Sequence, residues 1–175
     1  MNRGWLLTPV LLMLALLGCA HGRIVNGTFV SDDYGFSVAL PGPPYERIMA
    51  KGALVAVTDS GTGASIAIAV SPDTYTDANE SKKALDYITR DLFFFLTKKK
   101  YRVFEDVMVG GVQGRHAILT GMDDDKELIF SAYVTQFSGM IYDVVFWCEP
   151  QYFDTASAVF EKMVGTFVFR PGADK

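Results

Sequence analysis

Alternating apolar and polar positions predict that much of this chain forms short β-strands. Phe36, Val38 and Leu40 are separated by polar or small residues, and a proline-rich segment follows at 41–44. A period of two is typical of a strand with one buried face. We therefore expect two short strands within 29–40, joined by a turn at 32–35.

More strands are expected in two later groups. The β-branched runs 51–59 and 64–71 flank a Ser-Gly-Thr-Gly segment, a pattern that predicts a hairpin. Beyond residue 100, short turns separate further apolar runs, and this arrangement predicts an antiparallel meander. The four expected strands of the meander are 101–109, 112–121, 127–137 and 140–149.

Helical periodicity marks two other segments. The segment 77–99 carries an apolar stripe at helical spacing, with Asp77 as the expected N-cap and lysines at 98–100 to complement the helix dipole. A second helix is expected over 152–164, followed by a closing strand at 166–169. The expected inward residues are Leu85, Ile88, Leu92, Phe95 and Leu96 in the first helix and Phe153, Ala156, Phe160 and Met163 in the second.

The last hairpin of the meander indicates how the sheet is buried. If Ser138 and Gly139 form a two-residue loop, Phe137 pairs with Met140, and Val134 pairs with Asp143. Both faces of the two strands are then largely apolar, so both faces should be covered. This predicts an α+β fold, with an antiparallel sheet and two main helices. One face holds Leu128, Phe130, Ala132, Val134, Ile141, Val145 and Trp147, and the other holds Ile129, Tyr133, Phe137, Met140, Tyr142, Val144 and Phe146.

Composition excludes several classes of protein. The chain has 175 residues, of which 50% are hydrophobic and 21% charged, and this argues against wholesale disorder. The net charge of −4 gives no support to nucleic-acid binding. Two cysteines are too few for a disulfide scaffold, and two histidines leave little scope for a metal site.

The N-terminal segment has the features of an export signal. Arg3 precedes an apolar run at 5–17 that is too short to span a bilayer as a helix. The Leu-Leu-Gly-Cys sequence ending at Cys19 resembles a bacterial lipobox. That resemblance implies cleavage after residue 18 and acyl chains on Cys19, and Ala20 favours the periplasmic face of the outer membrane if the host has two membranes. The alternative is an ordinary signal peptide with an incidental cysteine.

The domain organisation follows from this assignment. We expect a signal peptide at 1–18, a linker at 19–25, a single domain at 26–170 and a short tail at 171–175. No internal repeat or low-complexity segment indicates a second domain.

The order of elements resembles that of a known fold family. The GFSVALPGPP segment at 35–44, the long helix, the central meander and YFDTASAVFEKMVGTFVF at 152–169 are similar to PsbP/DcrB-like domains. The resemblance covers about 26–170 and implies an α/β/α sandwich. It also implies non-enzymatic roles, such as assembly factors, binding modules and envelope lipoproteins, with no shared catalytic residues.

No sequence motif for catalysis or cofactor binding is present. The chain has no phosphate-binding loop, HExxH, CxxC or GxSxG sequence. The acidic run 123–125, followed by Glu127, is interpreted as a hairpin tip, since consecutive carboxylates in a tight turn point apart. Cys148 is expected to be a buried thiol, and His116 would activate it only through a contact made by the fold. We expect no enzyme activity, cofactor or metal.

Two sets of residues remain as candidate sites. Tyr87 and Phe94 lie opposite the buried stripe of the first expected helix, beside Arg90. Exposed aromatics near arginine are enriched at protein interfaces, although a loop at 25–30 or 41–45 could instead cover them. The preferred hypothesis is a lipid-anchored envelope module that binds a protein partner.

The alternative hypothesis is a small-ligand binder. Its pocket would be formed by Arg115, Tyr133, Asp143 and Trp147. The expected register, however, places Tyr133 on the opposite face from Trp147 and Asp143. Asp143 lies in an apolar strand and needs a partner, for which Arg115 and His116 are the candidates.

Overall fold

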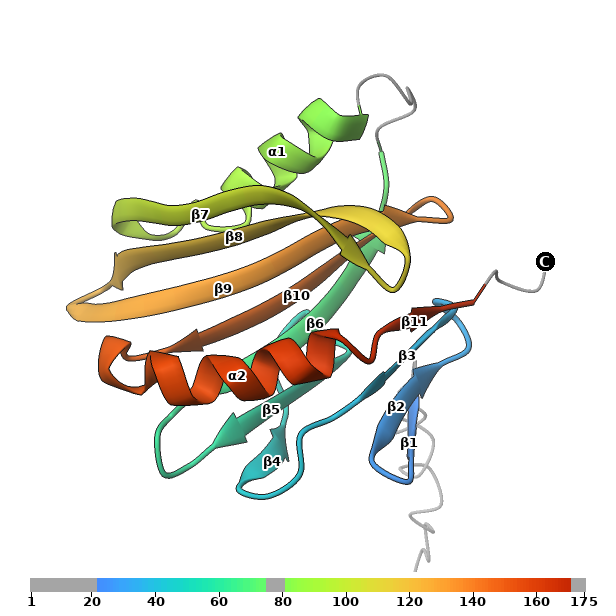
Figure 1. Cartoon of the computed structure of the whole chain (residues 1–175), viewed down its shortest axis with the longest axis horizontal. Coiled ribbons are helices and arrows are strands. Elements are labelled where there is room, and N and C mark those ends of the chain that lie inside the picture. The colour runs from blue at the N-terminus through green and yellow to red at the C-terminus, as the bar shows by residue number, and fades with distance from the viewer. Residues whose placement is uncertain (1–21, 75–80, 171–175) are drawn as a thin grey trace, which may run out of the picture.

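A computed structural model describes residues 22–74 and 81–170 of the chain, and their architecture is an α/β/α sandwich (Figure 1). A large antiparallel sheet has the strand order β4-β5-β6-β10-β9-β8-β7, and a small sheet has the order β1-β2-β3-β11. The strands are β1 (Arg23–Val25), β2 (Thr28–Ser31), β3 (Phe36–Ala39), β4 (Tyr45–Ile48), β5 (Val55–Asp59), β6 (Ser65–Pro72), β7 (Thr97–Val109), β8 (Val112–Asp123), β9 (Lys126–Phe137), β10 (Met140–Cys148) and β11 (Val168–Phe169). The helices are α1 (Ser81–Asp91), the 3-10 turn η1 (Pro150–Tyr152) and α2 (Phe153–Val164).

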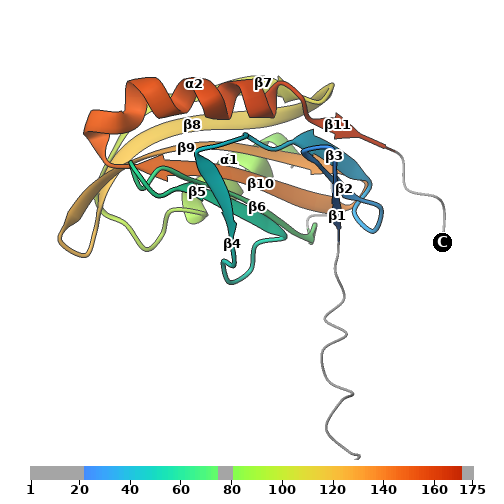
Figure 2. The ribbon, with the colours of Figure 1, turned by 90° about the horizontal axis from the view of Figure 1, so that it is seen from below.

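The two helices cover opposite faces of the large sheet (Figure 2), which confirms the expectation from the last hairpin that both faces are covered. Beneath α2, Phe160 and Met163 join Phe146 in the main apolar cluster. Beneath α1 and the segment after it, Phe93 and Leu96 pack with Phe130 in a smaller cluster. No helix within the described part of the chain is long and apolar enough to cross a membrane.

The predicted meander and its register are confirmed. Strands β7 to β10 pair in sequence order, and Phe137 lies opposite Met140 at the Ser138–Gly139 turn. Val134 lies opposite Asp143, as expected. The acidic run forms the turn between β8 and β9, where Asp124 has a positive φ of 51°. The register was predictable because alternation of side chains and a two-residue loop leave one pairing that buries the apolar positions.

The first helix is shorter than predicted. It ends at Asp91, and the chain enters β7 at Thr97, so the lysines at 98–100 lie on a strand. Phe93 and Leu96 are both almost fully buried against the sheet, while Phe95 is 48% exposed, against the prediction. Because the helix ends at Asp91, the chain from Thr97 onward can pair with β8 along its length. The apolar periodicity of one segment cannot reveal such a pairing with a distant strand. The expected cap Asp77 lies outside the described residues.

Residues 23–25, expected as part of the linker, form a strand of the small sheet. Arg23, Ile24 and Val25 form β1 and pair with β2, since Asn26 and Gly27 take positive φ angles and make a tight hairpin turn. The side chain of Arg23 donates a hydrogen bond to Asp32 across this small sheet. Residues 23–25 therefore pack as part of the domain, and Cys19 lies outside the described residues.

Candidate functional site

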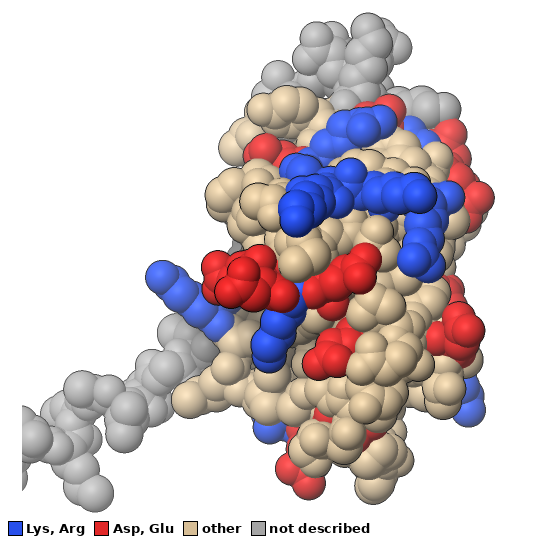
Figure 3. All heavy atoms as spheres, turned by 90° about the vertical axis from the view of Figure 1, so that its left-hand side faces the viewer, with Lys and Arg blue, Asp and Glu red and all other residues tan. Residues whose placement is uncertain are grey.

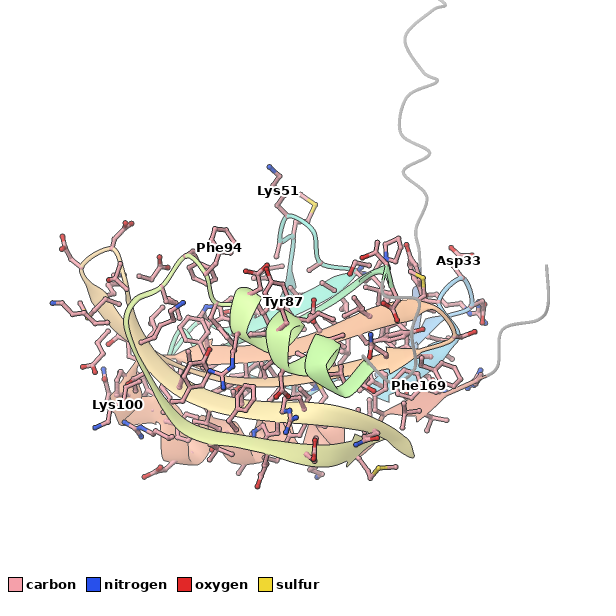
Figure 4. The ribbon with its side chains drawn as sticks, turned by 90° about the horizontal axis from the view of Figure 1, so that it is seen from above. Asp33, Lys51, Tyr87, Phe94, Lys100 and Phe169 are labelled. Atoms are coloured by element: carbon pink, nitrogen blue, oxygen red, sulfur yellow. The ribbon has the colours of Figure 1, made fainter. Side chains whose placement is uncertain are left out.

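The exposed aromatic side chains of α1 and the following turn form the candidate interaction surface. Tyr87 is 62% exposed, and Phe94 is 76% exposed. The loops at 25–30 and 41–45, which could have covered them, do not. Figure 4 shows both residues on the side of the molecule that carries α1. We call Tyr87, Arg90 and Phe94 the α1 surface.

Packing of the opposite side of α1 explains why Tyr87 is exposed. Ala84, Leu85 and Thr89 are buried towards the sheet, and the Thr89 hydroxyl donates to the carbonyl of Leu85 at 2.6 Å. Tyr87 lies between these positions in sequence and on the other side of the helix. The helix therefore presents Tyr87 to solvent.

Phe94 is exposed for a different reason from the one predicted. It follows the end of α1, in a turn closed by its own amide bonded to the Asp91 carbonyl at 2.9 Å. Phe93 takes the buried position, with its ring centroid 5.5 Å from that of Phe130. Its neighbour Phe94 is thereby directed outward and meets the ring of Phe95 edge to face at 6.0 Å.

Arg90 is exposed but has a structural role. Its guanidinium carbon lies 4.4 Å from the ring centroid of Phe104 and 5.5 Å from that of Tyr101, both on β7. Burial raises the pKa of the Tyr101 hydroxyl, and the positive charge of Arg90 opposes this rise. These cation–π contacts hold α1 against β7, so the helix that carries Tyr87 is firmly attached to the sheet.

The predicted ligand pocket is not assembled. Tyr133 packs in the cluster beneath α2, whereas Trp147 packs on the other face with the α1-side cluster. The hydroxyl of Tyr133 donates to Glu161 of α2, and burial together with this bond raises the pKa of the hydroxyl. Because the sheet separates Tyr133 from Trp147, the four residues cannot surround one ligand.

Arg115 is already occupied by contacts within the fold. Its side chain is 7% exposed and forms ion pairs with Asp86 of α1 and with Asp106 of β7, the latter at 3.0 Å. Its guanidinium carbon also lies 5.1 Å from the ring centroid of Phe104. Arg115 joins α1 to the edge of the sheet and is not presented to a ligand.

Asp143 lacks the partner that the sequence suggested. Arg115 and Asp143 both lie opposite Val134, one on each neighbouring strand, so the register places a valine between them. The Asp143 Oδ1 is buried and accepts no hydrogen bond from the residues that the structure describes. Burial raises the pKa of this carboxyl to about 6.

A hydrogen-bonded Ser131–His116–Glu105 chain was not predicted. His116 lies 3.0 Å from the Ser131 hydroxyl through Nε2 and 3.4 Å from Glu105 through Nδ1. Its ring stacks on Tyr133 with centroids 4.2 Å apart. This series of three side chains resembles the nucleophile, base and acid of a catalytic triad. Ser131, however, is completely buried and inaccessible to a substrate. Only the register of β8 against β9 could have identified it.

The other groups that could take part in catalysis or metal binding are the Cys148 thiol and the acidic and histidine side chains. Cys148 is buried, and desolvation together with Glu149 raises the pKa of its thiol to about 11, against thiolate formation. Within residues 22–74 and 81–170, no cluster of His, Cys, Asp or Glu side chains could hold a metal ion.

One apolar groove lies away from all of these residues. A groove of about 400 Å³ runs between the proline-rich segment and α2, on the side opposite α1. Its lining is mostly apolar and includes Leu40, Pro41, Tyr45, Val159 and Lys162.

Comparison with solved structures identifies the architecture as a PsbP/DcrB-like fold. The cyanobacterial PsbP protein of Synechocystis is 13% identical, with a TM-score of 0.54 over 91% of this chain and 98% of its own. LpqN of Mycobacterium tuberculosis, described as involved in cell envelope biogenesis, is 14% identical, with a TM-score of 0.61 over 79% and 87%. The yeast Ran-binding protein Mog1p is 12% identical, with a TM-score of 0.55 over 77% and 90%. No protein-family model and no curated sequence matches this chain.

Proposed function

We propose that this chain is a lipid-anchored envelope protein that acts as a non-catalytic binding module for a protein partner. The α1 surface would make the contact, and the observation that carries the proposal is the exposure of Tyr87 on a firmly attached helix and of Phe94 in the turn that follows it. Large aromatics that are held rigidly lose little side-chain entropy when a partner covers them.

One similar structure supports a binding role, and another supports an envelope location. Mog1p is described as a Ran-binding protein, and LpqN is described as involved in the cell envelope. The enclosed position of Ser131, Cys148 and His116 gives no support to an enzyme. The lipobox-like sequence ending at Cys19 supplies the envelope location in this proposal.

Crosslinking in the native cells tests the partner. A photo-crosslinking amino acid at position 87 or 94 should capture one specific protein. With the crosslinking amino acid placed instead at position 91, wild-type protein should capture the same partner. The Tyr87→Ala, Phe94→Ala double variant with the crosslinker at 91 should lose this product while remaining folded. Val168→Ala, at another exposed apolar position, is the matched control and should retain it. Capture that is unchanged in the double variant contradicts the assignment to the α1 surface.

The anchor is tested separately. Wild-type protein should incorporate labelled palmitate and remain in the membrane fraction, and Cys19→Ser protein should do neither. If the Cys19→Ser variant still carries the label, the lipidation site at Cys19 is wrong.

The groove between the proline-rich segment and α2 favours a second candidate function, the binding of a small apolar ligand. Its volume is within the range of small-molecule sites, and Lys162 provides a cationic group at its edge. Thermal-shift screening of wild type against Val159→Trp, which would fill the groove, tests this function. Stabilisation of wild type alone would support it, and an equal response of both proteins would contradict it.

A further inference from the structure

The turn between β4 and β5 exposes apolar side chains that the fold does not use. Met49 is completely exposed, and Ile48 is 36% exposed. Exposed Arg47 and Lys51 flank this pair. The amide of Ala53 bonded to the Ala50 carbonyl at 3.1 Å closes the turn. We call residues 47–51 the β4–β5 tip.

The tip projects from a defined side of the molecule. In Figures 2 and 4 it is the part of the described ribbon that extends farthest towards the side where β1 begins. Lys51 and Phe94 are directed to this side in Figure 4, whereas Lys100 lies on the other side. The tip and the N-terminal end of the domain therefore point in a common direction.

The point at which the chain leaves the domain is fixed by packing. Gly22 lies so close to Phe29 that an added Cβ would be 2.4 Å from the ring, and Phe29 itself is buried. From Cys19 to Gly22 the chain advances by three residues, which span at most about 11 Å when fully extended. This length is little more than the thickness of one headgroup layer, roughly 5–8 Å.

We propose that the β4–β5 tip is a second membrane contact of this protein. The proposal rests on the lipid anchor at Cys19 put forward above, because so short a tether holds the β1 side of the domain against the bilayer. Met49 and Ile48 enter the boundary between headgroups and acyl chains, while Arg47 and Lys51 lie at the phosphate level.

The composition of the tip fits a lipid surface better than a protein groove. An apolar centre between two cations matches the layered polarity of a membrane interface, where basic side chains interact with anionic lipid. Asp33 lies on the same side of the molecule in Figure 4, so the charge on this side is mixed and the apolar pair provides the main contribution.

The contact would also orient the α1 surface. In Figure 4 the tip points within the plane of the picture, whereas α1 faces the viewer. A domain held by Cys19 and the tip therefore presents Tyr87 along the membrane, where an envelope partner could reach it. With the anchor alone, the domain could rotate about the tether.

Fluorescence on the full-length lipidated protein tests the proposal. A polarity-sensitive probe is attached at Met49→Cys, and Lys100→Cys on the other side of the molecule is the control (Figure 4). The protein is reconstituted in vesicles of phosphatidylcholine and phosphatidylglycerol, in which the phosphatidylcholine carries brominated acyl chains. We expect strong quenching at position 49 and little at position 100. Equal quenching at both positions, or none at position 49, overturns the proposal.

A second measurement separates the tip from the anchor. Chains with Cys19→Ser, which lack the anchor, are floated with the same vesicles without bromine. Changing Ile48 and Met49 to Ser in this background should weaken binding about tenfold or more, since two apolar side chains no longer leave water. Met108→Ser, at another exposed apolar position on β7, is the matched control in the same background and should have the smaller effect.

The two proposals fail in different ways. Absence of palmitate from wild-type protein would contradict the anchor, whatever the probe at position 49 reports. Palmitate on the protein together with a water-exposed probe would contradict the tip and leave the anchor intact. Binding to vesicles that is indifferent to Ile48 and Met49 would likewise overturn the tip.

Discussion

The two faces of the large sheet are built from different chemistry. The α2 face contains a continuous apolar cluster, and its buried polar groups are satisfied, as in the hydrogen bond between His116 and Ser131. The α1 face has two smaller clusters, an internal ion-pair network around Arg115, and the Oδ1 of Asp143, which has no hydrogen-bond partner within 22–74 and 81–170. The α2 face is organised for stability, whereas the α1 face has less apolar packing and holds the exposed aromatics.

Charge distribution also differs across the molecule. Figure 3 shows basic side chains gathered in the upper part of the face that it presents and acidic side chains mostly below them. Exposed lysines at 98–100 begin β7, next to the end of α1, and Lys99 donates to the Phe93 carbonyl at 3.2 Å. The α1 face is therefore bordered by positive charge, although the whole chain carries −4.

Truncation within the α2 cluster should give the largest effect. Phe160 is completely buried and stacks on Phe146 with ring centroids 5.4 Å apart. Phe160→Ala should lower the free energy of unfolding by about 3–5 kcal/mol, because it leaves a large cavity. Urea denaturation measures this change. A loss below about 1 kcal/mol would mean that the α2 face is not the main source of stability.

The half-buried carboxyl of Asp143, whose Oδ1 is enclosed, should make the α1 face sensitive to pH. Since its pKa in the fold is about 6, above that of an exposed aspartate, the fold favours the neutral acid. The contribution of Asp143 to the free energy of unfolding is therefore greatest at pH below about 4 and is lost as the pH rises through 6. Asp143→Asn should therefore raise the free energy of unfolding at pH 7.5 by up to about 3 kcal/mol and change it little at pH 4.

Urea denaturation of wild type and Asp143→Asn at the two pH values provides the measurement. Asp125→Asn, at an exposed position, is the control and should show little change at either pH. An equal effect of Asp143→Asn at both values would show that the carboxyl is not held neutral by the fold.

Removal of the Arg115 charge should have the next largest effect. Arg115→Met keeps most of the side-chain volume but leaves Asp86 and Asp106 without their shared partner. Both carboxylates are 43% exposed and regain water, so the expected loss is about 2 kcal/mol. Hydrogen exchange should localise the loss to α1 and β7. Uniform acceleration across α2 as well would contradict the separation between the two faces.

Changes on the α1 surface should have the smallest effect on stability. Tyr87→Ala and Phe94→Ala remove exposed rings, so each should alter the free energy of unfolding by less than about 0.5 kcal/mol. The same changes should abolish partner capture if the proposed function is right. A loss of stability as large as that of Phe160→Ala would show that these rings belong to the core.

The sequence alone determined the parts of this protein that depend on local patterns. Alternation and the Ser138–Gly139 loop predicted the register of β9 and β10, because a shift by one residue would exchange the two faces of each strand. The periodicity of 152–164 likewise predicted α2 and its buried residues Ala156, Phe160 and Met163. The exposure of Tyr87 follows from the same kind of pattern.

Only the tertiary structure decided the contacts between distant segments. The end of α1 at Asp91 depends on β8, which pairs with the chain from Thr97 onward and gives its backbone an alternative to helical hydrogen bonds. The separation of Arg115 from Asp143 depends on the strand that lies between them. The direction of the β4–β5 tip relative to β1 depends on how the two sheets pack (Figure 2). Side-chain patterns report which positions are buried, but the partner at each position is set by the packing of the whole domain.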